Sequence, residues 1–297
     1  MFTSSQTNDL LGAAAEEISG ADYDSDEASM VRVVQQDYDL ATKLPSSFVA
    51  RMAEETSLGQ KTWAKARENS DFQAFLPALE RIIGMMQEQA DLLGYDEHPY
   101  DALLSQYERG MTTAQVKSIF DAHRPKLVDL IAQVGDAQQV DDSMLKLNFD
   151  RDTQREFALW AVKSFGFDFE RGGQAEAVHP FCTNFSVNDV RITTRFNDNW
   201  LNPALFGMMH EAGHGMYEQG IGQNLEGTPL AGGTSLGVHE SQSRMWENIV
   251  GRSKGFWSWA MPKLKDAFPQ LGQVTLDDFY KAINKVERSF IRVEADE

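Results

Sequence analysis

The sequence has little of three things: cysteine, positive charge and long apolar runs. Its single cysteine, Cys182, excludes an internal disulfide framework and any cysteine-rich zinc site, and we expect a small packed side chain there. With 27 Lys and Arg against 45 Asp and Glu, the net charge of −18 argues against nucleic acids and anionic membranes as partners. No stretch approaches the ~18 consecutive apolar residues of a membrane span. Residues 1–20 are polar and acidic, unlike a secretory signal, so we expect a cytoplasmic protein.

Apolar residues recur at helical spacing through most of the 297 residues, and we expect these stripes to pack in a core. The pattern predicts helices over residues 28–44, 46–69, 71–94, 113–134 with a kink at Pro125, 149–165, 202–220, 236–250 and 276–297. The last stripe includes Phe279, Val286 and Val293 and has no capping residue after it, which predicts a helix that continues to Glu297.

One region has the composition of strands. Residues 177–196 are rich in β-branched and aromatic side chains and are broken by a turn at Asn188-Asp189. The fold class we predict is therefore mainly α with one small sheet. The change of pattern separates an N-terminal helical region, 1–165, from a second region, 166–297, and we expect both to belong to one continuous structural domain.

Histidines gather just after this strand region, where His210-Glu211-Ala212-Gly213-His214 forms an HExxH pattern. On a helix, positions i and i+4 share a face, so both imidazoles can reach one metal ion. Glu211 can then lie beside the ion and take a proton from a bound water. Glycines at 213 and 215 weaken a helix, and we expect them to let another backbone approach closely.

The third protein ligand is not within this helix. The extended pattern HExxHxxGxxH is excluded, because Tyr217 and Gly220 occupy its last two positions. Two neighbouring residues of the next predicted helix, His239 and Glu240, are the candidates, and they lie ~100° apart around it. Glu240 would give a His₂Glu set with an open position for water. Between the two helices, the glycine-rich residues 220–237 contain no phosphate-binding pattern and predict a flexible connection.

Five motifs in order resemble those of the carboxypeptidase Taq (M32) family of metallopeptidases. They are HPF at 179–181, DxRxT at 189–193, HExxH at 210–214, HES-x-Q at 239–242 and IRxxAD at 291–296.

The resemblance implies a zincin-like helical metallopeptidase with a small β-sheet beside the HExxH helix. It implies a metallocarboxypeptidase that removes single residues from peptide C-termini with broad preference. The resemblance makes His210, His214 and Glu240 the ligands of zinc, with cobalt as an alternative ion, and Glu211 the general base. It also implies a peptide substrate and suggests a homodimer.

Other motif residues are candidates for holding the substrate. A bidentate arginine suits a terminal carboxylate, and Arg191 and Arg292 are candidates by motif position; internal salt bridges are their alternative role. His179 and His239 are candidate substrate donors, with a purely structural hydrogen bond as the alternative for His179. Asp189 is either an acceptor from a metal-bound histidine or a turn residue.

The chain departs from the family pattern at both ends. It lacks the family's initial motif with Trp-Asp and its late GxxQDxHW-type motif, so we expect the central portion of a longer enzyme. Two other functions fit the same residues: a different His₂Glu peptidase, such as an aminopeptidase or oligoendopeptidase, and a non-catalytic metal-binding protein.

Overall fold

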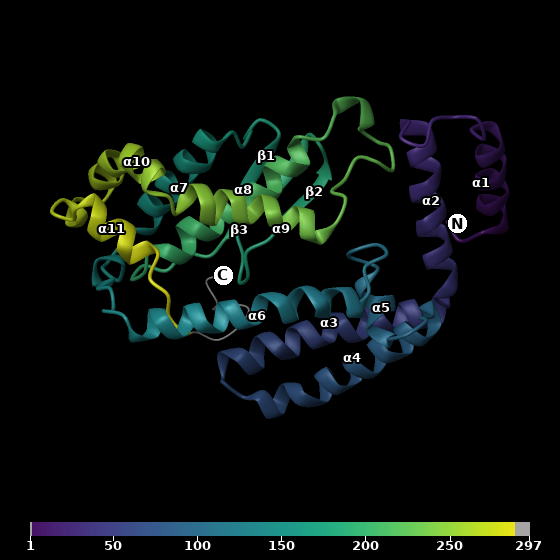
Figure 1. Cartoon of the computed structure of the whole chain (residues 1–297), viewed down its shortest axis with the longest axis horizontal. Helices are drawn as coiled ribbons and strands as arrows, with labels where there is room; N and C mark the ends of the chain where they lie inside the picture. Colours follow the sequence, from purple (N-terminus) through teal and green to yellow (C-terminus); the bar gives the residue numbers. More distant parts are fainter. Residues whose placement is uncertain (1, 289–297) are drawn as a thin grey trace. The chain divides into compact units, whose positions relative to one another are not determined.

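A computed structural model describes residues 2–288, which are mostly helical with one small sheet, as the sequence predicts (Figure 1). Their contacts form two compact units, one up to His123 and the other from Arg124. The domain boundary suggested after residue 165 rests on a change of sequence pattern, and it stays a prediction. No helix of the described part is long and apolar enough to cross a bilayer.

The first unit consists of helices. They are α1 (Ser5–Glu17), α2 (Asp26–Lys43), α3 (Ser46–Glu68), α4 (Phe72–Leu93), α5 (Pro99–Leu104) and the first part of α6 (Thr113–Asp136). Helix α4 begins where the Asp71 side chain accepts a hydrogen bond from the backbone N–H of Ala74. It ends at Gly94, whose φ of 80° favours glycine. The polar sequence gave no periodicity that predicted α1.

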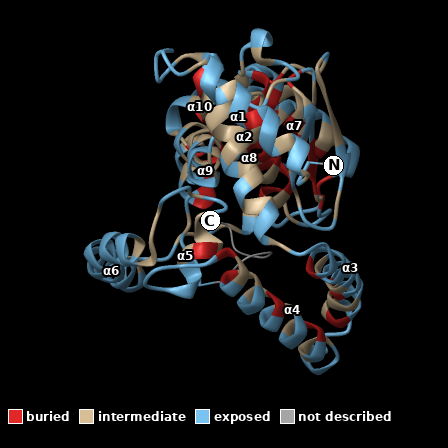
Figure 2. Cartoon of the chain, turned by 90° about the vertical axis from the view of Figure 1, so that its right-hand side faces the viewer, coloured by how far each residue is buried: buried red, intermediate tan, exposed pale blue. Residues whose placement is uncertain are grey.

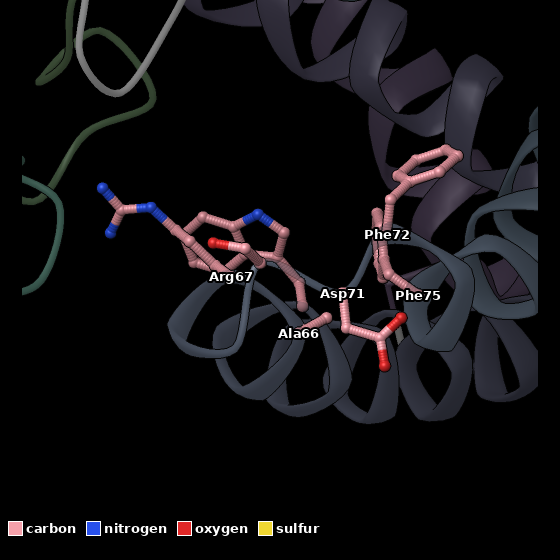
Figure 3. A pocket seen from close by; sticks show the side chains of 7 residues that line it. Ala66, Arg67, Asp71, Phe72 and Phe75 are labelled. Carbon is pink, nitrogen blue, oxygen red and sulfur yellow. The ribbon is translucent and has the colours of Figure 1, made fainter.

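An open hollow lies where α3 turns into α4 (Figure 3). Three aromatic residues, three polar residues and one alanine line it; they are Trp63, Ala66, Arg67, Ser70, Asp71, Phe72 and Phe75. All of them belong to the first unit, so the hollow shares no residue with the histidine motif.

The apolar stripe of α6 corrects one expectation. None of its residues is buried, and Ile119, Phe120 and Leu130 are 57%, 63% and 56% exposed (Figure 2). The helix also continues through Pro125. Periodicity predicts which face of a helix is apolar, but burial requires a second layer over that face.

The second unit contains the sheet and the remaining helices. Its elements are η1 (Ser143–Leu145), α7 (Arg151–Phe165), β1 (Gly172–Glu176), β2 (Cys182–Ser186), β3 (Asp189–Thr194), α8 (Asn202–Gln219), η2 (Gln223–Leu225), α9 (Leu236–Arg244), the π-helix η3 (Met245–Gly251), α10 (Lys254–Ala267), η4 (Pro269–Leu271) and α11 (Leu276–Ile283). The predicted strand region holds β2 and β3, whereas β1 and α10 were not predicted.

The sheet has the order β1-β3-β2, so β3 is central and β2 is an edge strand. β3 is parallel to β1 and antiparallel to β2. Val190 and Ile192 of β3 are fully buried in the main core, together with Met208, Met209 and Ala212 of α8. The HExxH helix is therefore anchored on the inner face of the sheet.

The end of the described chain also differs from the prediction. Helix α11 stops at Ile283, and Val286 lies beyond it in irregular structure. Asn284 ends the helix and donates side-chain hydrogen bonds to the carbonyls of Arg252 and Tyr280. Residues 289–297, which include the IRxxAD motif and Arg292, are outside the described residues.

Helices α8 and α9 meet backbone to backbone at Gly213. A Cβ placed there would lie 2.6 Å from Cα of Ser243 and 2.7 Å from the carbonyl oxygen of Gln242. The expectation that Gly213 admits another backbone is confirmed. Gly215 instead packs against the Phe167 ring, 2.6 Å from the position of its missing Cβ, so it admits a side chain.

We expect Gly213→Ala to lower the free energy of unfolding by about 1–3 kcal/mol, because the methyl group forces α9 away from α8. Gly207→Ala is the matched control on the same helix, since its Cβ would meet only ordinary contacts at 3.5 Å or more. That change should be neutral or stabilising by up to ~1 kcal/mol. Urea unfolding followed by circular dichroism measures both. Equal stability of the two variants would contradict the tight contact.

Candidate metal centre

Two histidines of α8 face one carboxylate of α9. Nε2 of His210 is 3.6 Å and Nε2 of His214 is 3.9 Å from Oε2 of Glu240. Within residues 2–288, these are the donors close enough together to hold one ion, with all three ligand atoms within 4.8 Å of one another. Ligands ~2.0–2.2 Å from a tetrahedral zinc ion would be ~3.3–3.6 Å apart, so the residues fit such an ion after a small contraction. Glu240 is 51% exposed, which leaves that side of the centre open.

The second ring nitrogen of His210 is held by a buried carboxylate. Its Nδ1 donates to Oε2 of Glu247 at 3.0 Å, and Arg252 donates to the other oxygen of Glu247 at 3.2 Å. Burial alone would raise the pKa of Glu247, but the hydrogen bond from His210 and the charge of Arg252 lower it. Burial likewise opposes the charged form of His210, yet Glu247 and the nearby carboxylates of Glu211 and Glu240 raise the His210 pKa.

The second ring nitrogen of His214 has a different partner. Its Nδ1 lies 3.2 Å from Nδ1 of His239, whose Nε2 is 2.6 Å from Oε1 of Glu218. Burial, with the charge of His210, lowers the pKa of His214 to about 4, so this ring is neutral at pH 7. His239, the rival third ligand in the sequence, therefore directs both nitrogens to protein groups and lies outside the donor set.

Glu211 is buried beside this donor set without belonging to it. Burial raises its pKa to about 7; the charge of His210 opposes this, whereas the charges of Glu240 and Glu247 reinforce it. A carboxylate with a pKa near neutrality both accepts and releases protons at physiological pH, which suits a general base.

The remaining candidates do not belong to the donor set. Nε and Nη2 of Arg191 each donate to an oxygen of Asp189 at 2.8 Å, so these two motif residues pair with each other. His179 is exposed just before β2. Cys182 of β2 is partly buried, and burial raises the pKa of its thiol to about 12, which makes it unreactive.

Sequence reasoning missed the carboxylates that hold the two rings. Glu218 is four residues after His214 on the same helix, and this spacing was an available signal. Glu247 had no such signal, because the π-helix from Met245 interrupts the α-helical spacing between Glu240 and Glu247. The contact of Glu218 with Asn184 of β2, at 2.8 Å, needed the tertiary structure.

A helix that carries two histidines and an adjacent glutamate, with a carboxylate from a later helix, defines an HExxH metal centre in a mainly α protein. The sequence matches the family described as Carboxypeptidase Taq (M32) metallopeptidase over residues 1–297, and the chain belongs to this family.

Individual relatives agree with this assignment. The chain is 37% identical to Carboxypeptidase 1 of Bacillus subtilis, covering 99% of this chain and 59% of that protein. It is 39% identical to Thermostable carboxypeptidase 1 of Thermus thermophilus, covering 98% and 60%. The crystal structure of BsuCP superposes with a TM-score of 0.94 at 36% identity, covering 99% and 59%. The M32 carboxypeptidase from Deinococcus radiodurans R1 gives 0.89 at 38%, covering 100% and 59%. The chain thus spans about three fifths of the length of these relatives.

The raised pKa of His210 predicts how the affinity of the donor set for a divalent ion, measured with zinc, depends on pH. Protonated His210 cannot bind an ion, so apparent affinity should fall as the pH is lowered through this raised pKa, by about tenfold per pH unit below it. In Glu247→Gln the raising charge is lost, so the fall should begin at lower pH. The same variant should bind zinc about 10–100-fold more weakly at high pH, where proton competition is absent.

Competition with a chromophoric chelator between pH 5 and 8 measures this for both proteins. Both proteins are compared in a Glu211→Gln background, because the charge of Glu247 also raises the pKa of Glu211. If the affinities of the two proteins differed by the same factor at every pH, Glu247 would not set the proton affinity of His210.

Proposed function

We propose that this chain carries the zinc-binding core of a metallocarboxypeptidase that hydrolyses the last peptide bond of peptides with broad specificity. The observation that carries the proposal is the convergence of His210, His214 and Glu240 with buried Glu211 beside them. Membership of the M32 family and the carboxypeptidase names of the relatives support it. Zinc is the proposed ion, because two imidazoles and one carboxylate form a set that it prefers, and cobalt is the alternative.

In the proposed reaction, each residue has one task. Zinc, when bound, would polarise the scissile carbonyl and lower the pKa of a water molecule. His210, His214 and Glu240 hold the ion, and Glu247 keeps the His210 ring oriented through its 3.0 Å hydrogen bond. Glu211 accepts a proton from the attacking water and gives it to the leaving amine.

The edge strand β2 is the proposed support for the peptide backbone. It pairs with β3 on one side, and Asn184 links it to Glu218 of α8. An edge strand offers N–H and C=O groups that an extended peptide can pair with. By motif position, His179 remains our candidate donor to the substrate, and Arg191 and Arg292 remain our candidates for binding its terminal carboxylate. Since Asp189 occupies Nε and Nη2 of Arg191, a substrate carboxylate would use Nη1 or displace Asp189.

The cytoplasmic location and the homodimer stay predictions of the sequence and of the family resemblance. The same holds for nucleic acids and anionic membranes, which the charge of −18 disfavours as partners.

Glu211→Gln should separate catalysis from metal binding. The amide keeps the shape of the side chain but cannot accept a proton, so we expect peptide hydrolysis to fall by about 10²–10⁴-fold. Zinc affinity should change by no more than a few fold, because Glu211 is not a ligand. Glu240→Gln is the matched comparison, since the same atomic change should weaken zinc binding strongly. Zinc binding with no Glu211-dependent hydrolysis would favour a non-catalytic metal-binding protein.

Peptides that differ only at their C-terminus test the kind of peptidase. The zinc-loaded chain should release single C-terminal residues from peptides with a free carboxylate, and C-terminal amidation should suppress cleavage, because the amide lacks the charge an arginine binds. Mass spectrometry of the products measures both. Cleavage of amidated peptides, or release of N-terminal residues, would instead indicate a different His₂Glu peptidase.

A further inference from the structure

A second line of hydrogen bonds runs from His214 away from Glu240. It passes from Nδ1 of His214 to Nδ1 of His239 over 3.2 Å, and from Nε2 of His239 to Glu218 over 2.6 Å. His210, by comparison, reaches its carboxylate Glu247 directly. The two histidines of the HExxH motif are thus held in different ways.

Glu218 acts only as an acceptor in this arrangement. Oε1 accepts from His239 and from the backbone N–H of Gly233 at 3.1 Å, and Oε2 accepts from Nδ2 of Asn184 at 2.8 Å. The carboxylate is almost fully buried, with 6% of the side chain exposed. Because a fixed N–H donor faces each oxygen, from Gly233 and from Asn184, the ionised form can accept all three hydrogen bonds.

The proton positions follow from this acceptor. Nε2 of His239 must carry the hydrogen that it donates to Glu218, and a neutral ring then has a bare Nδ1. That lone pair can only accept, so Nδ1 of His214 must carry the hydrogen between the two rings. Nε2 of His214, the nitrogen 3.9 Å from Glu240, is left with its lone pair free.

The glycine-rich connection between α8 and α9 keeps this line in place. A Cβ at Gly233 would lie 2.2 Å from Nε2 of His239 and 3.0 Å from Oε1 of Glu218. At Gly232, one residue earlier, nothing lies within 4 Å of a Cβ. Tyr217 also packs its ring edge-on against His239 and accepts at its hydroxyl from the N–H of Thr234. The sequence had suggested only a flexible connection here.

We propose that Gly233, Glu218 and His239 form a positioning relay that fixes His214 in the tautomer protonated at Nδ1. The unprotonated Nε2 of His214 then faces Glu240. His239 then acts through His214 and contacts neither the ion nor the substrate. The effect of the relay on metal affinity rests on the proposed zinc site, whereas its effect on the tautomer does not.

Gly233→Ala should weaken zinc affinity about 10–100-fold, because the new methyl group displaces His239 or Glu218 and frees the His214 ring. Gly232→Ala makes the same chemical change next to it and should alter the affinity by less than about twofold. Competition with a chelator at pH 8 measures both dissociation constants. Equal affinities would overturn the relay.

Two replacements of His239 with nearly the same shape separate hydrogen bonding from packing. His239→Asn keeps an acceptor near the place of Nδ1, whereas His239→Leu has none. We expect Asn to retain more zinc affinity than Leu, by about tenfold, because it still accepts from His214. If both variants lose affinity equally, the ring only fills space and the relay is wrong.

The tautomer can be read without metal. With ¹⁵N-labelled histidine at pH 8, the metal-free wild type should show His214 protonated at Nδ1 and His239 at Nε2; single histidine replacements assign the signals. In Gly233→Ala the His214 signals should shift toward the averaged values of mixed tautomers. A wild-type His214 protonated at Nε2 would overturn the proposal. Should the wild type bind no zinc, the proposed metal site fails and this measurement still decides the relay.

Discussion

The centre depends on how closely α8 and α9 approach each other. His210 and His214 belong to one helix and Glu240 to the other, so the distance between the helices sets the distance between their donor atoms. Gly213, which lies between the two histidines in the sequence, removes the side chain that would hold α9 away. Where no Cβ lies between them, two helices can pack with their axes closer than the usual 8–10 Å. The close approach of α9 therefore explains why the motif contains Gly213, although glycine weakens a helix.

The charge balance of the centre follows from that approach. Three glutamates, Glu211, Glu240 and Glu247, are brought near one another, and the raised pKa of Glu211 shows their mutual repulsion added to burial. Arg252 and the hydrogen bond from His210 stabilise Glu247 as an anion, which concentrates the cost on Glu211. A divalent cation at the donor set would offset this repulsion and return Glu211 toward its anionic, proton-accepting form. The same acidity that disfavours nucleic acids thus suits a metal site.

The sequence predicts most of the fold because helical periodicity is a local property. It indicated α4, α7 and α8, and strand composition indicated β2 and β3. It failed where the outcome depends on distant residues. Both α4 and α6 carry an apolar stripe, yet α4 buries part of its stripe whereas no residue of α6 is buried. At α11 the periodic run continues past Ile283, but the side chain of Asn284 bonds the carbonyl of Arg252, and the helix stops.

The same distinction applies within the site. The HExxH spacing predicts two ligands and a base because one helix turn fixes their relation, and a motif on the next helix predicts the third ligand. The groups that orient the ligands come from places that have no fixed spacing: a π-helical stretch for Glu247 and the glycine-rich connection for the N–H that holds Glu218. His239 is a residue type that binds metals, but its ring contacts His214 and Glu218 and lies outside the donor set. Sequence patterns therefore identify which atoms can bind a metal, and tertiary contacts decide which nitrogen of each ring is free to do so.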